Sequence, residues 1–259
     1  MDGLVVDKVS MIYGGNGGWE IKALENVEFQ VSQGDFLAVV GASGCGKTTL
    51  LRIIGGLVEQ TEGEIVFKKG TIEDLHRNCG FVFQDPTLLP WRDVLGNILL
   101  PLEVARGGKR DKREGNSERD EEKKKVKELL AMVELEGFEH FYPRELSGGM
   151  KQRVAIARAL AVNPDVIVAD EPTGNLDSAS GEQILDIIGE LHEKKGKTVI
   201  MVTHERYVAE RAQQILHLKD GKIVQKVKRR ISSGSNIYSS FFCISVLHIY
   251  DMSLYRHIL

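Results

Sequence analysis

Residues 41–49 fit the phosphate-binding pattern G-x-x-x-x-G-K-[ST]. An apolar run precedes them and another follows, which gives the strand, glycine turn and helix that the pattern requires. Glycines let backbone N–H groups curl around phosphate oxygens, and the helix dipole points its positive end at the same anion. The run, called the phosphate loop below, therefore predicts a nucleoside triphosphate site. Its expected contact residues are Gly41, Ser43, Gly44, Cys45, Gly46, Lys47, Thr48 and Thr49.

Three side chains in or beside the phosphate loop could contact the nucleotide or its metal ion. Lys47 can reach the β- and γ-phosphate oxygens, and the Thr48 hydroxyl can ligate Mg²⁺. Tyr13 lies upstream, on a piece of chain that could fold back beside the loop, where its ring could stack on an adenine. A half-exposed tyrosine at the end of a strand is the alternative interpretation of Tyr13.

Two adjacent carboxylates, Asp170 and Glu171, close the apolar run 166–169. An aspartate at such a strand end can hold Mg²⁺, directly or through water, and a glutamate near the γ-phosphate can orient the attacking water. Successive side chains of a strand point in opposite directions, so both roles can be filled at once. Taken alone, the pair could equally consist of turn or helix-capping acids.

The elements that must position these residues alternate between strand and helix. The sequence predicts an edge strand at residues 4–12 and a helix directly after the phosphate loop. Further strands are expected at 21–31, 63–67, 80–83, 166–169 and 198–202, further helices at 150–162 and 182–192, and a hairpin at 215–224.

Residues from about 94 to 162 interrupt this alternation and predict a helical insertion. Helical spacing begins at Val94 and precedes Pro101, and it returns at residues 126–133. Between them, we expect the mixed-charge run 106–125 to be a solvated loop. The two prolines and Trp91 of residues 84–91 indicate a shaped surface loop for partner contacts, with core leucines as the alternative.

Composition limits the function classes. The 259 residues carry a net charge of -3, which argues against a protein that coats nucleic acid. Three cysteines without metal-ligand spacing suit a reducing, cytoplasmic compartment. We expect no secretory signal and no membrane span of this chain's own, so a membrane role requires a partner. Residues 231–250 carry no Asp, Glu, Lys or Arg, and we assign no chemistry to them.

Residues 146–153, Leu-Ser-Gly-Gly-Met-Lys-Gln-Arg, resemble the signature motif of the nucleotide-binding subunits of ABC transporters. The other marks of that family follow the same order along the chain. Tyr13 resembles the adenine-stacking aromatic, Gln84 the Q-loop glutamine, and His204 the switch histidine. Asp170 and Glu171 resemble the acidic pair, and residues 175–177 the D-loop. The resemblance covers about residues 4–225.

The resemblance implies an α/β fold: a P-loop NTPase core with an antiparallel β subdomain and an inserted α-helical subdomain. It implies an ATPase domain at residues 1–228, followed by an atypical tail at 229–259. ATP and Mg²⁺ would be the cofactors. The catalytic residues would be Glu171, His204 and Gln84, and the metal ligands Thr48, Gln84 and Asp170. ATP would also contact Ser147, Gly148, Gly149 and Asp177 of a second subunit in a head-to-tail dimer.

The resemblance also implies partners: a second nucleotide-binding subunit, as in a homodimer, transmembrane permease subunits, and in an importer a substrate-binding protein. Residues 88–93 would border the groove for a short permease helix, at the cytoplasmic face of the cell membrane. Residues 83–86 and 89–92 are similar to ATPases of nitrate, sulfonate and taurine importers. Residues 171–177 and 217–221 are similar to the lipoprotein-release and macrolide-export branch. We favour import, because the Q-loop region faces the permease.

Two rivals remain on the sequence alone. A soluble ABC ATPase of DNA repair or translation tends to carry coiled-coil insertions or two fused cassettes, and neither pattern is present. A small-molecule kinase would use the phosphate loop but needs neither the run 146–149 nor a water-activating Glu171.

Overall fold

The computed structural model describes residues 3–14, 19–67, 71–105 and 116–229. They belong to one compact unit, Met1–Arg229. Apart from Arg229, the atypical tail proposed for residues 229–259 lies outside the described residues, as do residues 106–115 of the predicted loop.

A six-stranded sheet positions the phosphate loop. Its strand order is β5-β6-β7-β3-β8-β9, and the first five strands run parallel while β9 is antiparallel. The strands are β3 (Phe36–Val40), β5 (Cys79–Val82), β6 (Val166–Asp170), β7 (Thr198–Thr203), β8 (Gln214–Lys219) and β9 (Lys222–Lys228). Because carboxyl ends of parallel strands share one edge, the residues that follow β3, β6 and β7 are brought together there.

A second sheet has three antiparallel strands in the order β2-β1-β4. They are β1 (Gly3–Tyr13), β2 (Ile21–Ser32) and β4 (Glu62–Phe67). The prediction that the first strand is an edge strand is wrong, because β4 pairs with its free side. That partner lies some 50 residues further along the chain, and a local residue pattern does not reveal such a pairing.

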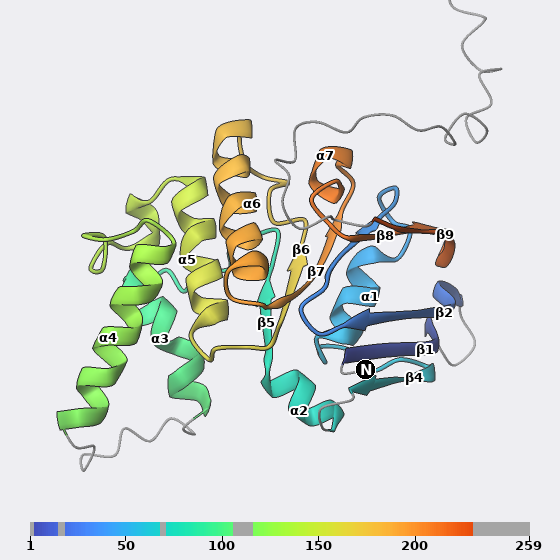
Figure 1. The fold of residues 1–259 in the computed structure, drawn as a ribbon, viewed down its shortest axis with the longest axis horizontal. Coiled ribbons are helices and arrows are strands. Elements are labelled where there is room, and N and C mark those ends of the chain that lie inside the picture. The colour runs from blue at the N-terminus through green and yellow to red at the C-terminus, as the bar shows by residue number, and fades with distance from the viewer. Residues whose placement is uncertain (1–2, 15–18, 68–70, 106–115, 230–259) are drawn as a thin grey trace, which may run out of the picture. The chain divides into compact units, whose positions relative to one another are not determined.

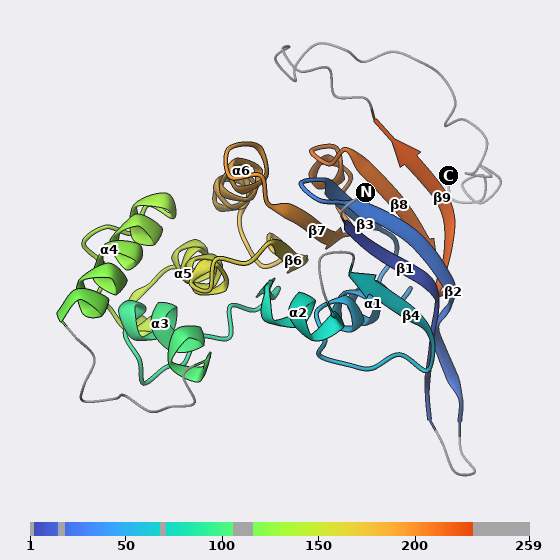
Figure 2. The same ribbon diagram turned by 60° about the horizontal axis from the view of Figure 1, so that its bottom comes forward.

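The helical insertion consists of α3 (Val94–Ala105), α4 (Asn116–Met132), a 3₁₀ turn (Pro143–Glu145) and α5 (Gly148–Leu160). Figures 1 and 2 show α3, α4 and α5 grouped together, on the side of β5 away from β3. α3 continues through Pro101, since burial of Val94 and Ile98 against the core offsets the cost of the proline.

One prediction for the insertion is wrong: residues 116–125 of the mixed-charge run are helical rather than a loop. Glutamate and lysine are strong helix formers, and the run leads directly into a buried apolar face. That face contains Val126, Leu129 and Leu130, which are at most 6% exposed. Charge composition alone does not separate a solvated loop from the exposed part of an amphipathic helix.

The remaining helices are α1 (Lys47–Ile54), α2 (Ile72–Arg77), α6 (Ser178–Glu193) and α7 (Arg206–Ala209). Two of these, α2 and α7, are short and were not predicted. The N-terminus of α2 carries a capping box, in which Thr71 and Asp74 each bond the other's backbone N–H.

The two faces of the six-stranded sheet bury separate cores. On β3, Phe36 and Ala38 pack with the helices α3 to α6, whereas Leu37 and Val39 pack with α1 and the three-stranded sheet. β6 and β7 alternate in the same way, as strand geometry requires. The predicted α/β architecture, with its antiparallel part and its helical insertion, is confirmed.

Candidate functional site

The phosphate loop joins β3 to α1 and is packed tightly from behind. A Cβ on Gly46, which has φ 106°, would lie 2.5 Å from the Ala23 carbonyl oxygen of β2. A Cβ on Gly41 would lie 2.2 Å from the Leu218 carbonyl oxygen of β8. Only glycine fits at either position. α1 begins at Lys47 without a side-chain cap, so the loop presents helix-terminal N–H groups for an anion.

The Lys47 side chain folds back over the loop and is only 4% exposed. Its Nζ donates to the carbonyl oxygens of Gly41, at 2.8 Å, and Ala42, at 3.1 Å. The same atom lies 3.4 Å from Glu171 Oε1. A nearly buried ammonium group is thus held directly beside the loop, where it complements a bound phosphate.

Thr48 and Asp170 form a pair of oxygen groups beside the loop. The Thr48 hydroxyl donates to Asp170 Oδ1 at 3.1 Å. Burial raises the pKa of the Asp170 carboxyl, and the bond from Thr48 acts against that rise. Among the described residues no cluster of three or more His, Cys, Asp or Glu could hold a metal. Mg²⁺ is usually bound by one or two carboxylates together with phosphate oxygens and water, and this pair fits that coordination.

Glu171 and His204 meet at the carboxyl edge of the sheet. His204 Nδ1 lies 2.9 Å from Glu171 Oε2, so the carboxylate contacts Lys47 with one oxygen and His204 with the other. Glu171 has φ 44°, an uncommon value for a residue with a side chain, and its N–H donates to Val202 of β7. Such strained backbone gathers at functional sites, where the surrounding structure stabilises it.

A further set of hydrogen bonds, beside Glu171 and His204, was not predicted. Thr173 donates through Oγ1 to Glu205 Oε2 at 3.2 Å, and the Glu205 N–H donates to Thr203 Oγ1 at 3.0 Å. These bonds connect the turn after Glu171 with the turn that carries His204. Thr173 lies two residues after Glu171, and Glu205 lies one residue after His204. This nearness in sequence was the signal available for finding the two residues.

The signature residues lie elsewhere in the chain's fold. Ser147 caps α5 by accepting from the Met150 N–H at 3.2 Å, and Ser147 and Gly148 are exposed. Gly149 is buried, and a Cβ there would lie 3.0 Å from Ser180 of α6. α5 packs on β5, which is three strand positions from β3 and therefore about 14 Å to the side. One chain does not bring the signature residues to its own phosphate loop.

Asp177 caps α6 close to the signature. Its Oδ1 accepts from the Ser180 N–H at 3.0 Å, and its Oδ2 accepts from the Ser180 hydroxyl at 2.8 Å. The backbone bond first, and the hydroxyl bond second, lower the pKa of the Asp177 carboxyl. The side chain is exposed, so it remains accessible to a second molecule.

Gln84 and Tyr13 come from two other parts of the fold. Gln84 is exposed, and its Nε2 would lie 2.9 Å from a Cβ placed on Gly174, in the turn after Glu171. Tyr13 is the last residue of β1 and pairs with Ile21 of β2. Ile21 lies two residues before Ala23, whose carbonyl oxygen lies close to Gly46 of the phosphate loop. The role of Tyr13 in adenine stacking stays a prediction.

Polar side chains that hold the backbone on the two sides of Gln84 were also missed by sequence reasoning. Asn97 of α3 is fully buried, and its amide bonds Leu89 N and O and the carbonyl oxygens of Arg92 and Asp93. Gln152 of α5 is fully buried too. A fully polar amide on an apolar helix face was the signal available in the sequence.

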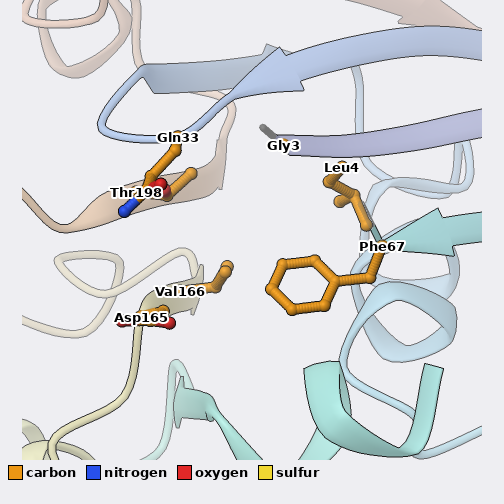
Figure 3. Close-up of a pocket in the computed structure, with 7 residues that line it drawn as sticks. All are labelled: Gly3, Leu4, Gln33, Phe67, Asp165, Val166 and Thr198. Carbon is orange, nitrogen blue, oxygen red and sulfur yellow. The ribbon is translucent and has the colours of Figure 1, made fainter. Parts of the chain in front are cut away.

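A small cavity lies at the opposite edge of the sheet, where β6 and β7 begin (Figure 3). It measures about 10 Å³, room for about one water molecule. Its lining comprises Gly3, Leu4, Gln33, Phe67, Asp165, Val166 and Thr198. Its size and its distance from the carboxyl edge exclude it as a nucleotide site.

Comparison with known proteins places this geometry in a family. The ABC transporter family model matches residues 24–174. An ABC transporter ATP-binding protein of Methanocaldococcus jannaschii is 43% identical over 220 residues, 81% of this chain and 91% of that protein. The aliphatic sulfonates import ATP-binding protein of Bacillus thuringiensis is 39% identical, covering 92% of this chain and 90% of its own length.

Two further similarities bear on the function. The lipoprotein-releasing system ATP-binding protein of Syntrophotalea carbinolica is 41% identical, covering 80% of this chain and 91% of its own length. A dimeric structure of an ATP-binding cassette in a post-hydrolysis state, bound to ADP and Pi, aligns with a TM-score of 0.76 at 39% identity. That alignment covers 88% of this chain and all of the other. The chain therefore belongs to the ABC transporter family, as an ATP-hydrolysing, ATP-binding subunit of a transporter.

Proposed function

We propose that the chain couples ATP hydrolysis to membrane transport as one half of a head-to-tail dimer. Each ATP would lie between the phosphate loop of one subunit and the signature residues of the other. One observation carries this proposal: Glu171 contacts both Lys47 and His204 beside the loop, while the exposed Ser147 belongs to a helix about 14 Å to the side. A second copy would supply the missing half.

The residues around the loop have separate roles in this proposal. Lys47 binds the β- and γ-phosphates, and the ring of Tyr13 stacks on the adenine. Thr48, Asp170 and Gln84 hold Mg²⁺. When bound, the ion neutralises charge on the phosphates and on the transferred group. The hydroxyl–carboxylate distance of 3.1 Å supports the first two ligands, since both oxygens already face one another.

Hydrolysis would rest on Glu171, His204 and Gln84. Glu171 orients the attacking water and accepts its proton, and the 2.9 Å contact with His204 fixes the direction of the carboxylate. His204 is half exposed, so it can contact the γ-phosphate as well. This chemistry requires positioning and electrostatic stabilisation, with no covalent intermediate on the protein.

Closure would depend on the signature side. Ser147, Gly148 and Gly149 open α5, so their hydroxyl and N–H groups can bind the γ-phosphate held by the other subunit, near Asp177. ADP lacks that phosphate, and hydrolysis would therefore open the dimer. The dimeric cassette bound to ADP and Pi supports a dimer for this chain.

A permease would dock on the segment that follows Gln84. Trp91 is 71% exposed there, and Phe141 and Tyr142 are each about 40% exposed on the neighbouring turn, where the Val94 N–H donates to the Phe141 carbonyl oxygen. Exposed aromatic side chains of this kind are typical of protein interfaces. No described helix is long and apolar enough to cross the bilayer. In this proposal, permease subunits hold the chain at the cytoplasmic face of the membrane.

For the cargo, we propose import of the nitrate, sulfonate and taurine type, with a substrate-binding protein as a further partner. The sulfonate import relative supports it. The lipoprotein-releasing relative, at a comparable identity, supports export as the second candidate. The genes beside this one test the choice: a permease with a periplasmic-type binding protein would favour import, and their absence would count against it.

The dimer itself is tested with Glu171→Gln in the full chain. On a sizing column with light scattering, we expect a dimer with Mg-ATP and a monomer with Mg-ADP or with ATP and EDTA. Glu182→Gln, an exposed glutamate on α6, is the matched control and should not trap the dimer. Monomer alone at saturating Mg-ATP would contradict the proposal.

A further inference from the structure

Two side chains of α5 hold the backbone on both sides of Gln84. Gln152 Nε2 donates to the Phe83 carbonyl oxygen at 2.8 Å. Arg158 donates through Nη2 to the Pro86 carbonyl oxygen at 2.8 Å and through Nη1 to that of Thr87 at 2.9 Å. We call Gln152 and Arg158 the α5 clamp. Of the residues that the clamp bonds, Phe83 lies one residue before Gln84 and Pro86 lies two residues after it.

Gln152 is an unusual residue for its place in the fold. It is fully buried, between β5 and the insertion, and its Oε1 has no hydrogen-bond partner among the described residues. An unpaired buried oxygen destabilises a fold, and an apolar side chain of the same size would avoid that cost. The bond that Gln152 makes to Phe83 is the only benefit that the described contacts show.

Arg158 holds a strained turn. Thr87 has φ 46°, which is uncommon for a residue with a branched side chain, and Arg158 bonds both its carbonyl oxygen and its Oγ1. The planar guanidinium fork reaches two successive carbonyl oxygens at once, which an ammonium group does not reproduce. Arg158 thus fixes the backbone at Pro86 and Thr87, shortly after Gln84.

The α5 clamp connects the N-terminus of α5 with the backbone around Gln84, and these two parts would contact different ATP molecules. α5 is a 13-residue helix, about 20 Å long, which begins at Ser147. In the proposed dimer, Ser147 contacts the ATP bound by the other subunit, whereas Gln84 reaches the ATP of its own subunit. A rigid helix that moves at its N-terminus also moves the side chains further along it.

We propose that Gln152 and Arg158 are positioning residues for hydrolysis, which place Gln84 according to the position of α5. This inference rests on the proposed dimer. Docking of the signature end on one nucleotide would then set Gln84 at the other, and the two ATP sites would become competent together. The clamp residues themselves touch neither nucleotide.

Trp91 provides a nearby readout, because it is 71% exposed and lies four residues after Thr87, which the clamp bonds. The chain has two tryptophans, so Trp19→Phe leaves Trp91 as the sole reporter. In a Glu171→Gln, Trp19→Phe parent, we expect Mg-ATP to produce the dimer and a change in Trp91 emission. With Arg158→Lys or Gln152→Met added, we expect the same dimer on the sizing column without that emission change.

Kinetics of the otherwise unaltered chain give a second readout. Either clamp variant should lower kcat about tenfold, equal to about 1.4 kcal/mol of lost transition-state stabilisation, and leave the KM for ATP within about twofold. Arg211→Lys, which disturbs an arginine bonded to Glu182 and Asp186 of α6, is the matched control and should leave kcat unchanged. Gln152→Met keeps the buried volume and removes the unpaired oxygen, so its melting temperature should stay close to that of the parent.

The outcomes separate the two proposals. A parent that dimerises, together with clamp variants that keep the full Trp91 response and normal kcat, would overturn the clamp alone. A dimerising parent without any Trp91 response would also overturn it. A parent that stays monomeric would overturn the proposed dimer, and the clamp inference with it.

Discussion

The phosphate-loop side and the signature side of this chain are organised in opposite ways. Beside the loop, Lys47 is nearly buried and shares Glu171 with His204, so each charged group already has partners within the chain. At the signature side, Ser147 and Asp177 are exposed, and their side chains do no more than cap their own helices. The first side is prepared before a ligand arrives, whereas the second offers groups that another molecule must approach.

This difference separates binding from closure. Variants of the loop side should alter nucleotide binding or chemistry in a single subunit. Variants of the signature side should leave that binding intact and act only on the association of two subunits. Four substitutions test the contrast, in order of decreasing expected effect.

Glu171→Gln should have the largest effect. The amide keeps the shape of the side chain but cannot accept a proton from water, so we expect turnover to fall at least about 100-fold. ATP affinity should change little, because Lys47 still bonds the loop carbonyls. Phosphate release and equilibrium ATP binding are the measurements. Appreciable turnover would remove Glu171 from the proposed chemistry.

Lys47→Ala should come next and act on binding. Charge-assisted hydrogen bonds to phosphate contribute about 1.5–3 kcal/mol, so the Kd for ATP should rise roughly 30-fold. Lys222→Ala, which breaks an exposed ion pair with Glu25, is the control and should leave the Kd unchanged. Titration calorimetry measures both. An unaltered Kd in Lys47→Ala would contradict the phosphate role of the ammonium group.

Ser147→Ala should separate stability from association. Loss of the helix cap costs about 1 kcal/mol, which lowers the melting temperature by about 2–4 °C in a chain of this size. Thr71→Ala removes the cap of α2 and should destabilise similarly. Only Ser147→Ala should also reduce the dimer that Glu171→Gln forms with Mg-ATP. Equal dimer populations in both variants would show that the Ser147 hydroxyl takes no part in closure.

Asp170→Asn should have the smallest effect, on the nucleotide-free chain. Burial raises the pKa of Asp170 above its ordinary value of 3.8, so the folded chain retains a proton that the unfolded chain has lost. The cost of the buried charge thus grows as the pH rises from the pKa of the unfolded chain through the higher pKa of the folded chain. We expect Asp170→Asn to melt at a higher temperature than the parent at pH 7 and to lose that advantage in acid.

The matched control for this last variant is Asp186→Asn, an exposed carboxylate on α6. Scanning calorimetry at several pH values gives the profile, and titration with Mg-ATP should show weaker binding by Asp170→Asn. A variant that is less stable at neutral pH and more stable in acid would reverse the expected sign and contradict the burial argument.

Local patterns were sufficient for much of the fold and for most candidate residues. The phosphate loop has a fixed spacing of glycines and lysine, and buried strands such as β6 and β7 are continuous apolar runs. The pairing of β4 with β1 was missed, because sheet order depends on distant partners. The helical start of α4 was missed, because its charged residues resemble a loop until the packing of Val126 is known.

Contacts made through side chains were the least predictable part of the site. The bond between Thr173 and Glu205, and those from Gln152 and Arg158, join residues separated by 32 to 72 positions. No spacing rule connects such pairs. The sequence shows only that each polar residue stands in unusual surroundings, and the fold decides which partner it meets.

The division of one sheet between two cores has a consequence for how the molecule can change over evolutionary time. Neighbouring residues of β3, such as Phe36 and Leu37, pack against different sets of side chains. Substitutions on the Phe36 side can reshape the helices that face a partner, while the Leu37 side keeps the packing of α1 and of the phosphate loop unaltered. One scaffold can in this way acquire a new docking partner without losing the chemistry that powers it.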